Sequence, residues 1–147
     1  MRIKKGFTLI ELMVTVSILV IIVMLAAPSF TNLLVKQNLN SNIRALLATF
    51  SDARSQSILL RKDVTVILNN TNKNTEINYY WSMEGRGSLV APTTIPSIVF
   101  QSDGTLKNTT KNTKFTDTNF IICSMNFSKT VTLTRVGTIT LGAEGSC

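Results

Sequence analysis

The residues of this 147-residue chain that could do chemistry are few, and their spacing excludes most enzyme reactions. There is no histidine, which removes His-based triads, His metal sites and the commonest general base. Two cysteines are too few for a zinc site, and the eight Asp and Glu residues are scattered. Glu84-Gly85-Arg86-Gly87 lacks the spacing of a phosphate-binding loop and predicts only a turn. We therefore expect no enzyme activity, no cofactor and no metal site.

One acidic residue has an unusual setting. Glu11 lies within the predominantly apolar run from Phe7 to Ala27, which follows a short basic head. On translocon-based scales, an acidic residue at the centre of a membrane helix opposes insertion by about 2.5 to 3.5 kcal/mol. An unpaired carboxylate in this position therefore indicates a partner from outside the segment.

The run itself predicts a membrane anchor rather than a cleaved signal peptide. It is longer than the roughly 7 to 15 apolar residues of a signal peptide, and Ala26-Ala27-Pro28 is a poor cleavage site. About 20 apolar residues are what a helix needs to span hydrocarbon. Arg2, Lys4 and Lys5 precede the run, so the positive-inside rule predicts a cytoplasmic N-terminus and an exported remainder.

The residues around Glu11 carry a family resemblance. The stretch Lys5-Gly6-Phe7-Thr8-Leu9-Ile10-Glu11 resembles the prepilin motif of type IV pilins and type II secretion pseudopilins. The resemblance implies that a prepilin peptidase cuts after Gly6 and that the new N-terminal residue, Phe7, is N-methylated. It also implies that Glu11 meets the free amine of a neighbouring subunit, and that Pro28 kinks the helix. The alternative is a chance acid in an ordinary single-pass anchor.

After Pro28 the sequence predicts the second half of one long helix. From Ser29 to about Lys62 no glycine interrupts the helical pattern, and polar residues separate the apolar ones. We expect one helix from Phe7 to about Arg61, whose second half presents an apolar stripe to a packed layer. The stripe consists of Leu39, Ile43, Leu46, Leu47, Phe50 and Ile58.

The remainder predicts an antiparallel sheet laid on that stripe, because short β-branched and aromatic runs alternate with Gly, Asn and Asp turn signals. Thr105 to Asn119 is nearly all Thr, Asn and Lys and predicts an exposed loop, while Pro92 and Pro96 bracket a loop or a sheet edge. The predicted strands are Val64 to Leu68, Ile77 to Trp81, Ile98 to Phe100, Phe120 to Ser124, Thr130 to Thr134 and Thr138 to Leu141.

A second resemblance covers most of this half. Ile98 to Thr105, followed by a C-terminal hairpin with a central Gly137, is similar to the GspH/FimT group of minor pilins and pseudopilins, to which FimU-type pilins belong. It implies an α+β type IV pilin fold, with a long N-terminal helix packed on a small antiparallel sheet. The expected plan is a leader (1–6), a transmembrane and assembly helix (7–28), its amphipathic second half (29–62) and a periplasmic β-sheet domain (63–147).

The same resemblance implies a structural role in starting or capping assembly. The implied partners are other pilin or pseudopilin subunits, the prepilin peptidase and the inner membrane, which holds the chain by a single pass before its incorporation into a pilus or pseudopilus. Nothing in the sequence separates the pilus from the secretion system.

Cys123 and Cys147 are the only cysteines, and an exported domain in an oxidising compartment favours a disulfide between them. Such a bridge would fasten the last residue of the chain, which follows a stretch containing Gly142 and Gly145. Two free thiols are the alternative.

The charge balance leaves a competing function open. From Thr31 onward there are 12 Lys and Arg against 7 Asp and Glu, a net charge of +5 that favours an anionic surface such as DNA. In the DNA-binding FimT branch the final hairpin carries a Gly-Arg-x-Arg signature, and here Gly137-Thr138-Ile139-Thr140 has threonine at both arginine positions. The structural role is therefore preferred to DNA uptake. The candidate phosphate contacts are Lys107, Lys111, Lys114, Lys129 and Arg135.

Overall fold

The computed structural model of the chain describes residues 7–93, 95–108 and 116–147, except for the side chains of residues 26–29 and 108. The chain forms two compact units, residues 1–34 and 35–147. One helix, α1 (Leu9–Leu60), makes up most of the first unit and contributes its C-terminal half to the second. The predicted helix from Phe7 to about Arg61 is therefore confirmed to within two residues.

Local side-chain and backbone chemistry sets both ends of α1. Thr8 precedes the helix, and its Oγ1 accepts a hydrogen bond from the Glu11 N–H at 3.3 Å, which satisfies one of the helix's unpaired N-terminal donors. At the other end Arg61 has a left-handed φ of 52°, and the Lys62 N–H donates to the Ser57 carbonyl at 3.2 Å. This is a Schellman cap, which reverses the chain and lets the first strand begin at Val64.

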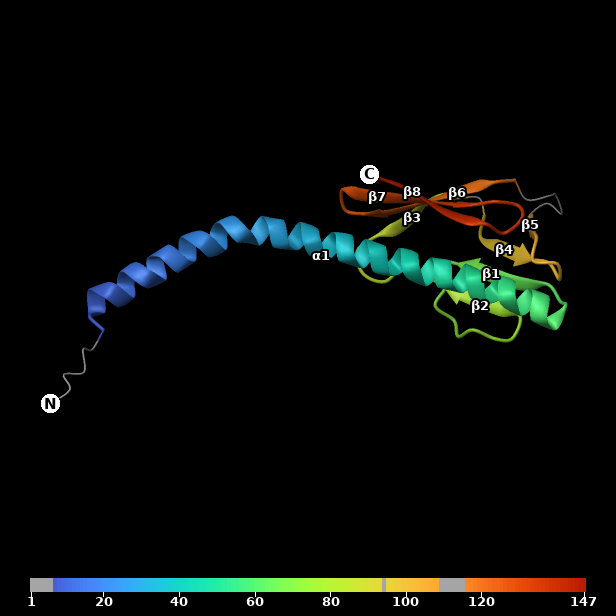
Figure 1. Cartoon of the computed structure of the whole chain (residues 1–147), viewed down its shortest axis with the longest axis horizontal. Coiled ribbons are helices and arrows are strands. Elements are labelled where there is room, and N and C mark those ends of the chain that lie inside the picture. Colours follow the sequence, from blue (N-terminus) through green and yellow to red (C-terminus); the bar gives the residue numbers. More distant parts are fainter. Residues whose placement is uncertain (1–6, 94, 109–115) are drawn as a thin grey trace. The chain divides into compact units, whose positions relative to one another are not determined.

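Two four-stranded sheets make up the rest of the second unit, with strand orders β2-β1-β4-β5 and β3-β6-β7-β8. Figure 1 shows these strands alongside the C-terminal half of α1. The strands are β1 (Val64–Leu68), β2 (Asn78–Trp81), β3 (Ser88–Ala91), β4 (Ser97–Phe100), β5 (Leu106–Asn108), β6 (Thr118–Ser124), β7 (Phe127–Leu133) and β8 (Ile139–Ser146).

The α+β fold class is confirmed, but the sheet arrangement differs from the expected one. The six predicted strands correspond to β1, β2, β4, β6, β7 and β8, whereas β3 and β5 were not predicted. The expectation of a single antiparallel sheet is wrong, because the strands divide into two sheets and β1 pairs with β2 in parallel. A parallel pair needs a connection that carries the chain back to its starting end, and residues 69–77 provide it.

The core of the second unit is centred on Phe50. Its ring centroid lies 6.4 Å from that of Phe100 on β4 and 5.6 Å from that of Phe120 on β6, so this one helix residue contacts both sheets. Both ring pairs are tilted, an arrangement that aromatic quadrupoles favour. Other buried members of this core include Leu39, Ile43, Leu46, Ala53, Val64, Val66, Ile98, Leu106, Ile122, Val131 and Leu133.

The predicted helix stripe is mostly confirmed. Leu39, Ile43, Leu46 and Phe50 are buried, and Leu47 packs at the edge of the core. The prediction that Ile58 belongs to the stripe is wrong, because its side chain is 49% exposed and the fully buried residue of that turn is Ser57. The stripe advances by alternating steps of four and three residues, which select position 57 rather than 58.

The predicted exposed loop from Thr105 to Asn119 is also wrong at its ends. Leu106 is 2% exposed and begins β5, while Thr118 and Asn119 belong to β6. A single leucine among polar residues gives little signal in the sequence, but here it fills the end of the core beside β4. Residues 109–115 lie outside the described residues.

The predicted disulfide is present between Cys123 and Cys147, whose Cα atoms are 6.0 Å apart. Cys123 lies on β6 and Cys147 follows β8, with β7 between these strands in the sheet. The bridge therefore fastens the last residue of the chain to a strand that β8 does not itself contact. For a separation of 24 residues, the chain-entropy model gives a stabilisation of about 3.5 kcal/mol.

Candidate functional site

The first turn of α1 holds the acid that the sequence singled out. The Glu11 Oε2 atom accepts a hydrogen bond from the Thr8 hydroxyl at 3.4 Å, and Thr8 is exposed together with Phe7. Among the described residues, Glu11 forms no salt bridge. The carboxylate is therefore held near the chain's start by a neutral group and is still available to a cation. Gly6, the predicted cleavage residue, lies outside the described residues.

The rest of the first unit presents an apolar surface. Every side chain from Phe7 to Leu25 is exposed. Besides Thr8, this stretch has two hydroxyl residues, and both bond to the helix itself: Thr15 donates to the Leu12 carbonyl at 2.9 Å and Ser17 to the Met13 carbonyl at 2.8 Å. In this stretch, therefore, Glu11 is the side chain that needs a polar partner from outside the helix.

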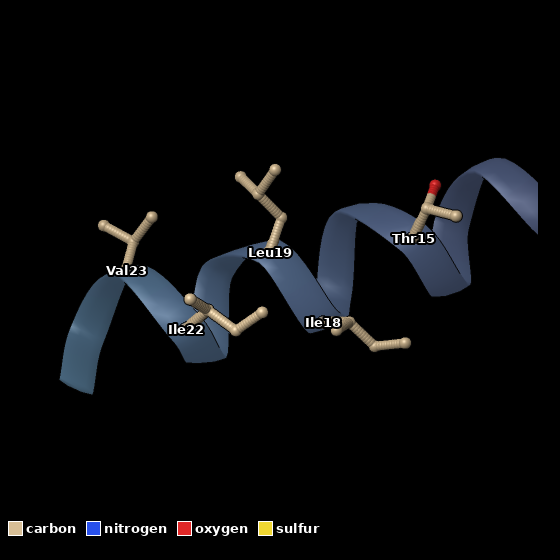
Figure 2. Close-up of a pocket in the computed structure, with 5 residues that line it drawn as sticks. All are labelled: Thr15, Ile18, Leu19, Ile22 and Val23. Atoms are coloured by element: carbon tan, nitrogen blue, oxygen red, sulfur yellow. The ribbon is translucent and has the colours of Figure 1, made fainter. Parts of the chain in front are cut away.

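Figure 2 shows how part of this surface is shaped. Thr15, Leu19 and Val23 form one row at four-residue spacing, and Ile18 and Ile22 form the next row. Rows at this spacing create a shallow apolar groove, which is the shape that receives the side-chain ridge of another helix.

No single helix among the described residues is long and apolar enough to cross a membrane, whereas two stretches of α1, Leu9–Leu25 and Phe30–Leu60, meet that requirement together by length and composition. They are separated at residues 26–29, whose side chains are not described. The predicted kink at Pro28 therefore falls outside the described side chains, and the predicted transmembrane segment remains a prediction.

Two of the candidate DNA contacts are engaged in ion pairs. Lys107 Nζ lies 3.1 Å from Asp63 Oδ2. Lys129 Nζ lies 3.6 Å from Glu144 Oε1 and donates a hydrogen bond to Asn40 Oδ1 at 3.1 Å. The side chain of Lys129 is only 19% exposed, so its role is to join β7 to α1 and β8.

The remaining candidates do not assemble into a basic site on the described surface. Arg135 is exposed in the turn between β7 and β8, where its main-chain N–H donates to Asp117 Oδ1 at 3.0 Å. This places a carboxylate beside the one described candidate that has no ion pair. Lys111 and Lys114 lie outside the described residues.

Arg54 has a role that the sequence did not reveal. From α1 its guanidinium donates to the Gly137 carbonyl at 3.2 Å and to the Val136 carbonyl at 3.0 Å. A Cβ atom on Gly137 would lie 2.8 Å from both the Gly104 carbonyl oxygen and Arg54 Nε. The two hairpin turns that carry the second resemblance, one from each sheet, therefore meet beneath this arginine. The glycines signalled turns in the sequence, but nothing indicated that the turns touch.

Asn42 is a second polar residue of α1 with an unforeseen role. Although its side chain is polar, it is only 6% exposed. Its Nδ2 donates to the Glu84 carbonyl at 3.0 Å, and its Oδ1 accepts from the Glu84 N–H at 2.8 Å. This pair of bonds fastens the predicted turn at residues 84–87 to the helix.

Comparison with known proteins agrees with these features. Residues 1–27 match the family described as the prokaryotic N-terminal methylation motif, which implies processing by a prepilin peptidase and anchoring in the inner membrane before assembly. The motif and the fold together make the chain similar to type IV pilins, which are structural proteins.

The fold is that of a solved minor pilin. The chain is similar to the crystal structure of the type IV minor pilin FimU of Pseudomonas aeruginosa strain PAO1, with a TM-score of 0.55 and 15% sequence identity. The match covers 74% of this chain and 90% of FimU. No curated protein matches the chain.

Proposed function

We propose that this chain is a minor pilin, a structural subunit that initiates or caps the assembly of a type IV pilus. One observation carries the proposal: a carboxylate with no cationic partner among the described residues stands in the first turn of an exposed apolar helix, as the fifth residue after the predicted cleavage site. A carboxylate in that setting needs a cation from another chain, and an assembling filament provides one on each neighbouring subunit.

The proposed maturation creates that cation. Cleavage between Gly6 and Phe7 releases a new amino group, which N-methylation leaves basic and therefore cationic. When the first units of two subunits pack in hydrocarbon, the ammonium of one lies against Glu11 of the other. In a low-dielectric layer a correctly registered pair offsets the cost of burying both charges, whereas a subunit out of register leaves both unpaired. The pair thus selects the register, while the apolar groove provides contact area.

Substitution of Glu11 tests this proposal. Glu11→Val favours membrane insertion but leaves the neighbouring amine unpaired, so we expect normal anchoring and loss of the chain from sheared filaments. Glu11→Gln keeps the side-chain shape and removes the charge, and it is expected to have the same defect. Glu76→Gln, at an exposed acid after the helix, is the matched control and is expected to assemble normally. Normal assembly of the Glu11→Gln chain would contradict the proposed pair.

The preference for a pilus over a type II secretion pseudopilus rests on two supports: the similarity of the fold to FimU, and the C-terminal disulfide that resembles FimU-type proteins. The alternative function, DNA binding in natural transformation, receives no support from the ion-paired Lys107 and Lys129. Titration of the whole chain with duplex DNA at two salt concentrations tests it, because phosphate contacts weaken as salt rises.

A further inference from the structure

The two sheets have four outer edges, and those of the first sheet are closed. The loop before β2 covers the edge of that strand: Thr75 N–H donates to the Asn78 carbonyl at 2.8 Å, and the Tyr80 N–H donates to Asn74 Oδ1 at 2.8 Å. At the opposite edge, β5 has three residues, and its Leu106 N–H donates to the Arg135 carbonyl at 3.0 Å. Within the part of the chain that the structure describes, neither edge offers a row of free main-chain groups to another chain.

The β3 edge of the second sheet is protected in a different way. β3 has four residues, its register shifts between Leu89 and Ala91, and Pro92 follows it directly. Short length, a bulge and proline are the features by which natural proteins prevent pairing at an edge strand.

The β8 edge differs from the other three. β8 has eight residues, is exposed after Ile139, and contains neither lysine nor proline. Its one charged residue, Glu144, is already neutralised, because Lys36 and Lys129 lie 3.7 and 3.6 Å from its carboxylate oxygens. A bulge opposite Lys129 to Val131 separates Ile139–Leu141 from the last residues of the strand.

The direction of the main-chain groups in Ile139–Leu141 follows from the hairpin. Thr134 N–H donates to the Thr138 carbonyl at 2.9 Å, so Thr134 and Thr138 form a hydrogen-bonded pair. Such pairs alternate along an antiparallel ladder, which makes Thr132 and Thr140 the next one. Ile139 and Leu141 therefore direct their N–H and C=O groups away from β7. Among the described residues, neither has a hydrogen-bond partner on that outer side.

We propose that the outer edge of β8 is a docking edge for an extended strand of a different subunit in the same filament, which pairs with Ile139–Leu141 as a fifth strand of the sheet. The inference rests on the proposed filament function. The occupant is set by the chemistry of the edge: alternating main-chain donors and acceptors match only another extended backbone, and an edge without unpaired charge fits an uncharged strand beside Thr140 and the half-exposed Leu141.

Proline at position 141 provides the test, because it removes an outward N–H and leaves the bonds to β7 intact. The full-length Leu141→Pro chain is expected to form its disulfide and to be lost from sheared filaments. Leu141→Ala removes the side chain, keeps the N–H and is expected to assemble normally. Lysine at an edge strand prevents pairing without constraining the backbone, so the Leu141→Lys chain is expected to be lost from filaments as well. This variant tests the docking edge if the proline variant does not fold.

Normal assembly of a folded Leu141→Pro or Leu141→Lys chain would overturn the docking edge. If Glu11→Gln still abolishes assembly in the same strain, the filament function stands and only the inference fails. The purified full-length chain in detergent is expected to be monomeric by light scattering. A dimer that Leu141→Pro converts to monomer would also overturn the proposal, because a second copy would then occupy the edge.

Discussion

Glu11 and Asn42 are both polar residues of α1, and their surroundings give them different tasks. Among the described residues, only the Thr8 hydroxyl binds the Glu11 carboxylate, which leaves the carboxylate available to a cation. The Asn42 amide is fully bonded within the chain: its Oδ1 accepts from the Glu84 N–H, and its Nδ2 donates to the Glu84 carbonyl and, at 2.9 Å, to the Asn38 carbonyl. A polar residue in a helix thus marks an intermolecular site only where its own chain leaves it unsatisfied.

The burial of Asn42 gives the first prediction at this scale. Asn42→Ala leaves the main-chain groups of Glu84 without their partner, so we expect a loss of about 1 to 3 kcal/mol in the free energy of unfolding, measured with urea. Asn38→Ala, at an exposed position one turn earlier, is the control and should change stability little. Equal effects of the two substitutions would show that the bonds to Glu84 contribute nothing.

Asp103 gives a prediction about pH. The Thr105 hydroxyl donates to its carboxylate at 2.7 Å and the Thr105 N–H at 2.9 Å, which lowers the pKa of Asp103 below its ordinary value of 3.8. A depressed pKa in the folded state stabilises the fold above the ordinary pKa, and this contribution disappears as pH falls through the folded value.

Asp103→Asn should therefore lose less stability than the unsubstituted chain between about pH 5 and about pH 2, because asparagine does not titrate. Urea unfolding of both chains at several pH values in this range measures the difference. Parallel stability curves for the two chains would contradict the assignment.

At the scale of elements, the junction of α1 with two hairpin turns is the feature that joins the two sheets at one end. Arg54 bonds the turn between β7 and β8, and that turn in turn accepts the Leu106 N–H of β5 through the Arg135 carbonyl. Gly137 is central because its φ is 78° and its Cβ position is occupied. Both the backbone and the packing therefore require glycine.

A matched pair of glycines separates these two requirements. Gly85→Ala has the same left-handed backbone, with a φ of 82°, but nothing lies within 4 Å of its Cβ position, so we expect a cost of about 1 to 2 kcal/mol. Gly137→Ala adds a clash with Gly104 and Arg54 and should cost clearly more. Thermal unfolding of the two variants measures the difference, and equal melting temperatures would contradict the crowded junction.

The element scale also shows what the sequence could predict. β1 was predicted with its observed bounds because Val64 to Leu68 has clear β-branched character. The predictions for Ile58 and Leu106 were wrong because the burial of these residues depends on the three-dimensional arrangement. The spacing of the helix stripe buries Ser57 rather than Ile58, and Leu106 is buried because β5 pairs with β4. β3 was missed because its four residues pair with β6, far along the chain, and local sequence does not record such pairing.

The candidate site also has residues that the sequence could indicate and residues that it could not. The roles of Gly6, Phe7 and Glu11 remain predictions, and they could be made from the sequence because their motif is local and covalent chemistry requires those residue types in order. Local sequence patterns do not reveal the roles of Arg54, Asn42 and the β8 edge, because these depend on contacts between distant segments of the chain.

At the scale of the whole molecule, the two units have complementary compositions. Residues 7–25 of the first unit expose an apolar surface with one acid, whereas the second unit buries a complete core and closes its last strand with a disulfide. Exposing so many apolar side chains to water is unfavourable, so the first unit needs hydrocarbon or other subunits around it. The second unit, in contrast, buries its apolar side chains in a core of its own.

The most direct test of the filament account is the N-terminus of the chain recovered from sheared filaments. Mass spectrometry is predicted to find a first residue of N-methylated Phe7, and Gly6→Ala is predicted to leave an unprocessed precursor in the membrane that is absent from filaments. An unprocessed Gly6→Ala chain within filaments, or a filament chain that begins at Met1, would contradict the account.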